Sequence, residues 1–301
     1  MIEIRNLNKK FDGFQAVSDL NLRVKTGSVY GLFGTNGAGK TTVLKHIAGI
    51  LRADSGAIEI NGESVYENCS IKGRLAFIPD DLYFFSACSL QESALFYRSV
   101  YRGWNQDLYE EMTALFKIDL RRKLSKFSKG MQKQAAFILA ISTSPDYLIL
   151  DEPIDGLDPL IRKLVWKRIL DGVAERKMTV LSSSHNLREM ENICDSMGLM
   201  SEGRMMIERD LNELKSDIQK VQVAFRNEAA PGENRYSGLE VMHRESRGSI
   251  DLLIVRNPKN AVESSIRAHD PILLDFLPLS LEEIFIYEFG GDENAAKDTL
   301  F

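Results

Sequence analysis

The feature that most constrains the fold of this chain is a glycine-rich turn between an apolar strand and a helix. The run GTNGAGKTT occupies residues 34–42, follows the β-rich run SVYGLF and leads into the helical pattern of VLKHIAGIL. Glycines at such a turn let backbone N–H groups point inward and approach phosphate oxygens, where a Cβ atom would intrude. A strand, a glycine-rich turn and a helix in this order predict a phosphate-binding loop in an α/β domain.

The residues of this loop have separate tasks in nucleotide binding. The pattern Gly-x4-Gly-Lys-Thr runs from Gly34 to Thr41. We expect Lys40 to reach the β- and γ-phosphates as a point charge and the Thr41 hydroxyl to bind Mg²⁺, while the following helix presents its positive end. The predicted nucleotide-binding residues of the loop are Gly34, Thr35, Asn36, Gly37, Ala38, Gly39, Lys40, Thr41 and Thr42.

Two acidic residues follow a second apolar strand. The run YLILDEP places Asp151 at the strand end and Glu152 directly after it. Behind a phosphate loop, we expect Asp151 to bind Mg²⁺, directly or through water, and Glu152 to polarise the attacking water as a general base. The alternative is an ordinary strand-end turn with solvated acids, which the phosphate loop makes the weaker interpretation.

A third strand ends at one of the four histidines of the chain. The run VLSSSHN carries its apolar strand to His185. A lone histidine is usually structural or solvent-facing. A position at the same sheet edge as Lys40 and Asp151 nevertheless predicts a role at the γ-phosphate. Glu152 and His185 are therefore the predicted catalytic residues.

Changes of periodicity divide the chain into segments. Helical periodicity dominates residues 82–144, between two stretches in which strands alternate with helices and turns. From about residue 211 a charged helix, strands and further helices suggest a small α+β domain. We expect an α/β nucleotide-binding domain over 1–210 with a helical insert at 82–144. An accessory α+β domain over 211–301 would end in the frayed tail GGDENAAKDTLF.

Composition limits the classes of partner. The chain has 38 Lys+Arg against 43 Asp+Glu and a formal charge of −5, so no global basic field points to nucleic acid. The three cysteines are widely spaced and lack metal-ligand intervals, as expected of reduced thiols in a cytosolic protein. No apolar run approaches the roughly 18 residues of a membrane span. We expect a soluble chain whose membrane work comes through a partner.

Five motifs in order resemble the nucleotide-binding subunit of ATP-binding cassette (ABC) transporters. They are GTNGAGKTT, FSKGM, YLILDEP, GLDP and SSSHN, and the resemblance covers about residues 1–210. It implies the P-loop NTPase fold of ABC ATPases, with a mixed sheet core, an antiparallel β subdomain and a helical insert. It also implies ATP and Mg²⁺ as ligands, a second ATPase subunit and an integral membrane permease as partners, and a cytoplasmic place on the inner face of the cell membrane.

The resemblance assigns further residues to the ATP site. Phe11 stands where the family has an aromatic residue that stacks on adenine, although from the sequence alone it could equally be a core residue. Asp158 occupies the usual acidic position of the loop that touches the partner subunit. In the family, the signature helix of one subunit faces the phosphate loop of the other. Ser128 and the N–H of Gly130 are therefore expected to contact the γ-phosphate across the interface.

The chain departs from the family at two places. In FIPDDLYFF the usual glutamine after the proline is Asp80, whose carboxylate can still ligate Mg²⁺ but brings negative charge toward the γ-phosphate. In the signature, FSKGM replaces the common Leu-Ser-Gly-Gly-Gln, and Lys129 either adds charge attraction across the interface or points to solvent. The Ser-Lys-Gly-Met version is similar to bacterial drug- and antibiotic-export ATPases.

These features predict an ATPase that dimerises around ATP and powers a separate permease, exporting a hydrophobic or antibiotic-like compound. In the region 80–102, the aromatic residues Tyr83, Phe84 and Phe85 would meet the permease, or else form the core of the insert. The alternative is a soluble cassette ATPase of translation, repair or cofactor assembly. One phosphate loop and the lack of sustained heptads count against it. The accessory domain would bind a regulator or stabilise the dimer.

Overall fold

The chain divides into two compact units in the structure, which is a computed structural model. The structure describes residues 1–85, 87–226 and 235–289. The first unit comprises Met1–Asn186 and Ile193–Glu208, and the second comprises Leu187–Asn192 and Arg209–Phe301. The segment 187–192, which the sequence interpretation placed in the first domain, thus groups with the second unit. The expected boundary after residue 210 stays a prediction, and the tail expected to fray lies outside the described residues.

A six-stranded sheet of order β10-β9-β3-β8-β7-β6 forms the centre of the first unit. Its strands are β3 (Val29–Phe33), β6 (Leu75–Ile78), β7 (Tyr147–Leu150), β8 (Thr179–Ser184), β9 (Ser196–Ser201) and β10 (Arg204–Asp210). Strands β9, β3, β8, β7 and β6 pair in parallel, and β3, β7 and β8 are buried along their whole length. Because the carboxyl ends of parallel strands meet at one edge, Gly34, Asp151 and His185 begin the loops along that edge.

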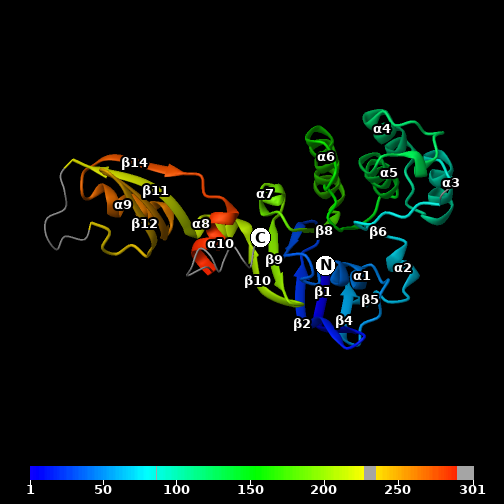
Figure 1. The fold of residues 1–301 in the computed structure, drawn as a ribbon, viewed down its shortest axis with the longest axis horizontal. Coiled ribbons are helices and arrows are strands. Elements are labelled where there is room, and N and C mark those ends of the chain that lie inside the picture. The colour runs from blue at the N-terminus through cyan, green and yellow to red at the C-terminus, as the bar shows by residue number, and fades with distance from the viewer. Residues whose placement is uncertain (86, 227–234, 290–301) are drawn as a thin grey trace. The chain divides into compact units, whose positions relative to one another are not determined.

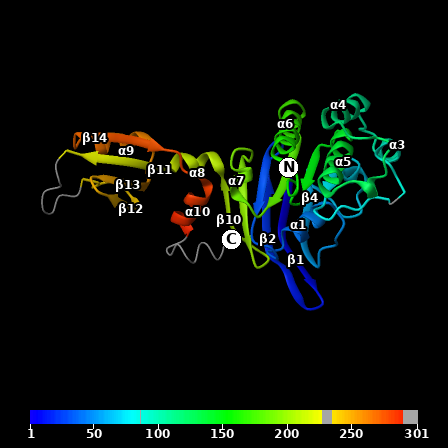
Figure 2. The same cartoon turned by 45° about the horizontal axis from the view of Figure 1, so that its top comes forward.

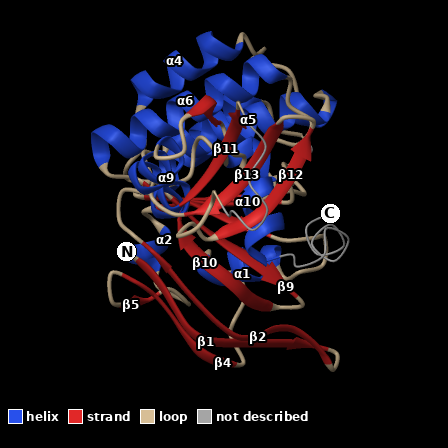
Figure 3. Ribbon diagram, turned by 90° about the vertical axis from the view of Figure 1, so that its left-hand side faces the viewer, coloured by secondary structure: helices blue, strands red, loops and turns tan. Residues whose placement is uncertain are grey.

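An antiparallel sheet of order β2-β1-β4-β5 forms a second layer of this unit. Its strands are β1 (Ile2–Phe11), β2 (Phe14–Val24), β4 (Ser55–Ile60) and β5 (Glu63–Ser64). Helix α1 (Lys40–Ile47) lies between the two sheets (Figure 3). Its buried Leu44 shares one hydrophobic core with Ile4 and Val17 of the antiparallel sheet and with Leu181 of the parallel sheet. The helix that follows the phosphate loop is therefore held on both faces.

Helices α3, α4 and α5 gather into the expected helical insert (Figures 1 and 2). The helices of the first unit are α1, α2 (Cys69–Lys72), α3 (Leu90–Val100), α4 (Gln106–Phe116), the 3₁₀ turn η1 (Leu124–Lys126), α5 (Lys129–Ser142) and α6 (Pro159–Arg176). Side-chain caps start the insert helices: Ser89 forms a capping box with Glu92, and Asn105 and Ser128 cap α4 and α5. Residues 135–142 of α5 are all buried, so this helix is the core of the insert.

The second unit is built on a four-stranded antiparallel sheet of order β12-β13-β11-β14. Its elements are α7 (Leu187–Met190), α8 (Leu211–Asp217), β11 (Ile218–Phe225), β12 (Val241–Arg247), β13 (Ile250–Arg256), α9 (Lys259–Arg267), β14 (Pro271–Leu277) and α10 (Leu281–Phe289). Val262 and Ile266 of α9 pack on Val221 and Leu253 of the sheet. An ion pair between Arg188 and Glu282 joins α7 to α10. The alternation of strands and helices is the α+β pattern expected for this region.

The described helices are too short or too polar to span a membrane. Helix α6 is the longest of those in the first unit at 18 residues, but charged residues such as Arg162, Lys163 and Asp171 interrupt it. Helix α5 is more apolar, yet its 14 residues rise only about 21 Å, against about 30 Å of hydrocarbon.

Replacement of Leu44 by alanine tests the role of α1 in joining the two sheets. Leu44 is fully buried between them, so Leu44→Ala should lower the free energy of unfolding by about 2–5 kcal/mol. Leu95 on α3 is 61% exposed, and Leu95→Ala is the matched control, with an expected change below about 0.5 kcal/mol. Urea titration followed by circular dichroism measures both. Equal losses in the two variants would contradict the sandwiched position of α1.

Candidate nucleotide-binding site

The phosphate loop and its neighbours surround a cavity of about 360 Å³ at the carboxyl edge of the parallel strands. The residues that line it are Phe11, Phe14, Ala16, Asn36, Gly37, Ala38, Gly39, Lys40, Thr41, Thr42, Asp80 and Glu152. They come from the β1–β2 hairpin, from the loop and α1, and from the segments that follow β6 and β7. Residues far apart in the sequence thus meet around one space of ligand size.

The loop needs its glycines for two different reasons. A Cβ atom on Gly34 would lie 2.4 Å from the carbonyl oxygen of Met200, and one on Gly39 would lie 2.7 Å from that of Ala16. Gly37 has open space around it but a φ of +86°, which favours glycine. The first two glycines let the loop pack against its neighbours, and the third allows the turn around the cavity.

Lys40 lies buried beneath the loop. Its Nζ donates to the carbonyl oxygens of Gly34 at 2.7 Å and Thr35 at 3.2 Å, and lies 3.3 Å from Oε1 of Glu152. The ammonium group therefore sits among the loop carbonyls and the carboxylate, where it can serve a phosphate as a point charge.

Asp151 is 1% exposed at the end of β7. Ser183 Oγ donates to its Oδ1 at 2.7 Å, and the Thr41 hydroxyl also hydrogen-bonds to it. Burial raises the pKa of Asp151, the two hydroxyl groups oppose this, and the nearby carboxylates of Glu152 and Asp80 raise it further. A buried carboxylate beside a hydroxyl and two more acids is a donor set that suits a hard cation such as Mg²⁺.

Glu152 has a backbone that most side chains avoid. Its φ of +43° lies in the left-handed region, and its N–H donates to Ser183 Oγ at 3.0 Å. In the carboxylate, Oε2 lies 3.0 Å from Nδ1 of His185. The other oxygen, Oε1, is buried and forms an ion pair with Nζ of Lys40 at 3.3 Å, but within the described residues it accepts no hydrogen bond. A buried carboxylate oxygen that lacks a hydrogen-bond donor fits a water molecule or a ligand group.

His185 reaches Glu152 from the end of β8. Its backbone N–H also donates to Oε2 of Glu152 at 3.3 Å, while its side chain stays 46% exposed. Ligand atoms of Glu152, His185 and Asp155 lie within 4.8 Å of one another. The structure therefore brings both predicted catalytic residues together and adds Asp155 beside them.

Two aromatic side chains are among the residues that line the cavity. Phe11 is 41% exposed and Phe14 is 68% exposed, and they pair across the turn between β1 and β2. Lys9 lies over the ring of Phe11 at 5.3 Å. The open alternative that Phe11 is a core residue is wrong, because its ring lines the cavity instead.

Ser128, Gly130 and Asp158 do not line this cavity. Ser128 Oγ accepts from the N–H of Met131 at 3.3 Å, so it caps α5, and Asp158 caps α6 by accepting from Leu160 and Ile161. A Cβ atom on Gly130 would lie 2.8 Å from the carbonyl oxygen of Gly156. Within one chain, Gly130 thus packs against the loop that follows Glu152, and the two signature residues do not line the chain's own cavity.

Besides Asp155, the sequence interpretation missed Phe14, Ser183 and Lys133. Phe14 follows Phe11 across an Asp-Gly turn, and that hairpin signal could have placed it opposite Phe11. Ser183 bonds to both acids: its hydroxyl donates to Asp151 and accepts from the N–H of Glu152. In the sequence, only its place in the run of serines before His185 indicated such a role. Lys133 bonds to Asp80 and to the main chain of Glu152. Because lysines are usually exposed, the sequence did not indicate that this one is buried.

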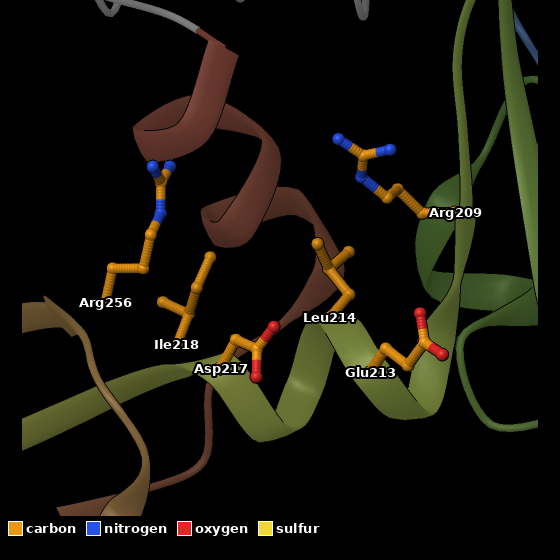
Figure 4. Close-up of a pocket in the computed structure, with 6 residues that line it drawn as sticks. All are labelled: Arg209, Glu213, Leu214, Asp217, Ile218 and Arg256. Carbon is orange, nitrogen blue, oxygen red and sulfur yellow. The ribbon is translucent and has the colours of Figure 1, made fainter. Parts of the chain in front are cut away.

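A further pocket of about 320 Å³ lies within the second unit. Its lining residues are Arg209, Glu213, Leu214, Asp217, Ile218 and Arg256 (Figure 4). Figure 4 shows the two carboxylates on α8 and the two guanidinium groups farther out, with the apolar side chains of Leu214 and Ile218 among them. Mixed charges on an open surface do not define one ligand class, so the pocket adds nothing to the ATP site.

The loop, the buried acids and the parallel sheet define a phosphate-loop nucleotide-binding domain. Residues 17–155 match the ABC transporter family. The ABC transporter ATP-binding protein YtrB of Bacillus subtilis (strain 168) is 31% identical over 97% of this chain and 99% of its own length. The bacitracin transport ATP-binding protein BcrA of Bacillus licheniformis is 32% identical over 73% of this chain and 73% of its own. A dimeric structure of MJ0796, a bacterial ABC transporter cassette, superposes with a TM-score of 0.64 and 19% identity, over 70% of this chain and 99% of that one.

The chain belongs to the ATP-binding subunits of ABC transporters. The expected fold class is confirmed, since the sheets and the helical insert are those of a cassette ATPase. Membership makes the chain an ATP-binding ATPase of this family.

The hydroxyl of Ser183 can be tested by its removal. Ser183→Ala removes one of the two hydroxyl bonds to Asp151 and leaves the N–H of Glu152 without its acceptor, so the kcat of ATP hydrolysis should fall by about tenfold or more. Ser182→Ala is the matched control, because its equally buried hydroxyl makes one long bond of 3.5 Å, to the carbonyl of Ser183. Steady-state phosphate release measures both variants. A similar fall in the two would contradict the assignment of Ser183 to the acidic pair.

Proposed function

We propose that this chain is the Mg²⁺-dependent ATPase subunit of an ABC exporter and that it works as a head-to-tail dimer on a separate membrane permease. The observation that carries the proposal is that Lys40, Thr41 and Glu152 line one cavity. Behind them, Asp151 accepts a hydrogen bond from Thr41, and His185 lies 3.0 Å from the carboxylate of Glu152. A phosphate loop with a buried acid for the metal and a second acid next to it suits the hydrolysis of a nucleoside triphosphate.

Glu152 is the general base of the proposed mechanism. Its Oε1 faces Lys40 and is free to accept a proton from an attacking water, while His185 holds Oε2. The contact with His185 fixes the orientation of the carboxylate. It also holds the imidazole of His185 where we expect the γ-phosphate to bind. Lys40 binds the β- and γ-phosphates, and backbone N–H groups of the glycine-rich loop stabilise the negative charge.

Thr41 and Asp151 would hold the metal, with Asp80 as a third oxygen donor beside the cavity. When bound, Mg²⁺ neutralises charge on the phosphate oxygens as the terminal bond breaks. The hydroxyl of Thr41 already contacts Asp151, so these two donors need little rearrangement.

The signature residues complete the site of a second subunit. Ser128 and Gly130 lie at the N-terminus of α5, an exposed helix end that favours an anion, and they do not line their own chain's cavity. In the proposed dimer they contact the γ-phosphate held by the partner, and Asp158 lies in the loop that touches that partner.

Replacement of the proposed base should trap the ATP-bound dimer. Glu152→Gln keeps the shape of the site but removes the proton acceptor, so ATP should still bind while kcat falls by about 100-fold or more. Size-exclusion chromatography with Mg²⁺-ATP should show a dimer that the wild type forms only transiently. The control is Glu175→Gln, an exposed glutamate on α6. Normal turnover in Glu152→Gln would overturn the assignment of the base.

An exposed row of aromatic side chains on the insert supports a permease contact. Tyr83 is 85% exposed, Phe85 is 61% exposed and Phe96 on α3 is 53% exposed. Edge-to-face contacts join Tyr83 to Phe85 and Phe85 to Phe96, with centroids 6.4 and 6.1 Å apart. Phe84 is half-buried and lines a small groove of about 80 Å³ with Tyr97. Most of the row is thus surface rather than core of the insert, as a docking site for an apolar helix requires.

The docking row is testable without disturbing the ATP site. Phe85→Ser with Phe96→Ser should leave ATP hydrolysis by the chain alone unchanged, because neither ring lines the ATP cavity. Co-purification with the permease in detergent should fall by about tenfold or more, since two apolar anchors are lost. The control is Ile50→Ser, an isolated residue that is 56% exposed. Undiminished co-purification of the double variant would contradict the docking site.

The name of the bacitracin transport relative and the Ser-Lys-Gly-Met signature favour export of a hydrophobic or antibiotic-like compound. Through the permease, the chain would lie on the cytoplasmic face of the membrane. Recovery of a polytopic membrane protein with the native chain distinguishes this proposal from a cassette ATPase that acts without a permease. The accessory domain would stabilise the dimer or bind a regulator.

A further inference from the structure

Lys133 is a charged residue in an unusual place. It lies on the face of α5 that packs into the first unit, five residues after the helix cap Ser128, and it is only 7% exposed. A buried ammonium group needs partners of opposite charge or good hydrogen-bond acceptors. Lys133 has one of each among the described residues, and both belong to the ATP site.

The first partner is the main chain of the proposed base. Nζ of Lys133 donates to the carbonyl oxygen of Glu152 at 2.8 Å. On the other side of the same residue, the N–H of Glu152 donates to Ser183. The left-handed φ of +43° is thus held by a hydrogen bond at each end of the residue. An unfavourable backbone conformation persists when neighbouring groups fix it in this way.

The second partner is the residue that departs from the family pattern. Nζ of Lys133 also lies 3.3 Å from Oδ1 of Asp80, whose side chain is 58% exposed and lines the ATP cavity. Where the family usually has a neutral glutamine, this chain has a carboxylate with a buried cation directly behind it. The extra negative charge next to the phosphates is therefore balanced from within the same chain.

We infer that Lys133 is a positioning residue for ATP hydrolysis: it fixes the main chain of Glu152 and neutralises Asp80, so that a carboxylate can replace the usual glutamine beside the ATP cavity. This inference rests on the proposed function and adds a role for two residues of that site. Lys133 touches neither nucleotide nor water in this role and acts through Glu152 and Asp80.

The two contacts of Lys133 predict separate kinetic effects. Lys133→Met keeps the volume but removes the charge and the donor, so Asp80 is left uncompensated and Glu152 loses one of its two backbone bonds. We expect KM for Mg²⁺-ATP to rise by about fivefold, because Asp80 then repels the phosphates, and kcat to fall by about tenfold, because the base is less well held.

A second substitution separates the two effects. Asp80→Asn removes the repelling charge and keeps a side-chain oxygen as a donor for the metal. The double variant Asp80→Asn/Lys133→Met should therefore return KM to within about twofold of the wild type while kcat stays about tenfold low. Lys167→Gln, an exposed lysine on α6, is the control and should change neither constant. Additive KM effects, or wild-type constants in Lys133→Met, would overturn the inference.

A measurement without nucleotide gives a readout independent of turnover. Hydrogen–deuterium exchange of the full chain should increase in Lys133→Met at residues 79–81 and 152–156, and remain unchanged in Lys167→Gln. Exchange that stays equal to the wild type at both segments would also overturn the inference. These experiments distinguish a failure of this inference from a failure of the proposed function. If Glu152→Gln abolishes turnover but Lys133→Met does not lower it, the role of Lys133 is wrong and the proposed function stands.

Discussion

The ATP site of this subunit depends on how the backbone of one residue, Glu152, is held. Its left-handed conformation turns the carboxylate toward Lys40 and His185 instead of letting β7 continue straight on. Ser183 and Lys133 hold the two sides of that residue, and Ser183 also holds Asp151. The proposed metal ligand, Asp151, and the proposed base, Glu152, are thus held by a neighbouring strand and by helix α5 of the insert, so the geometry of the site depends on the packing of both.

Much of the fold could be predicted from the sequence because its signals are local. The phosphate loop, the acids after YLIL and the histidine after VLSSS each follow an apolar strand, and parallel pairing brings the ends of β3, β7 and β8 to one edge. The capped helices 90–142 of the insert have a clear helical period. The grouping of 187–192 with the second unit could not be foreseen, because it depends on contacts of α7 with α10 that are remote in sequence.

The sequence predicted most residues of the site but fewer of the contacts between them. Lys40, Asp151, Glu152 and His185 carry recognisable patterns, but the sequence gives no sign that a lysine on α5 is buried against Asp80. Sequence reasoning identified the extra charge of Asp80 as a difficulty for binding phosphate. The structure supplies its counter-charge, which lies 53 residues farther along the chain.

The close approach of Gly130 to the carbonyl of Gly156 has a mechanical consequence. With no side chain between them, the start of α5 and the loop after Glu152 have little room to slide past each other. In the proposed dimer, the first of these segments senses a γ-phosphate on the partner, and the second carries the base for the chain's own ATP. Each subunit would therefore couple the two catalytic centres of the dimer. When the start of α5 moves away from the partner's ATP, the loop after Glu152 moves with it, and the base of the chain's own site is displaced.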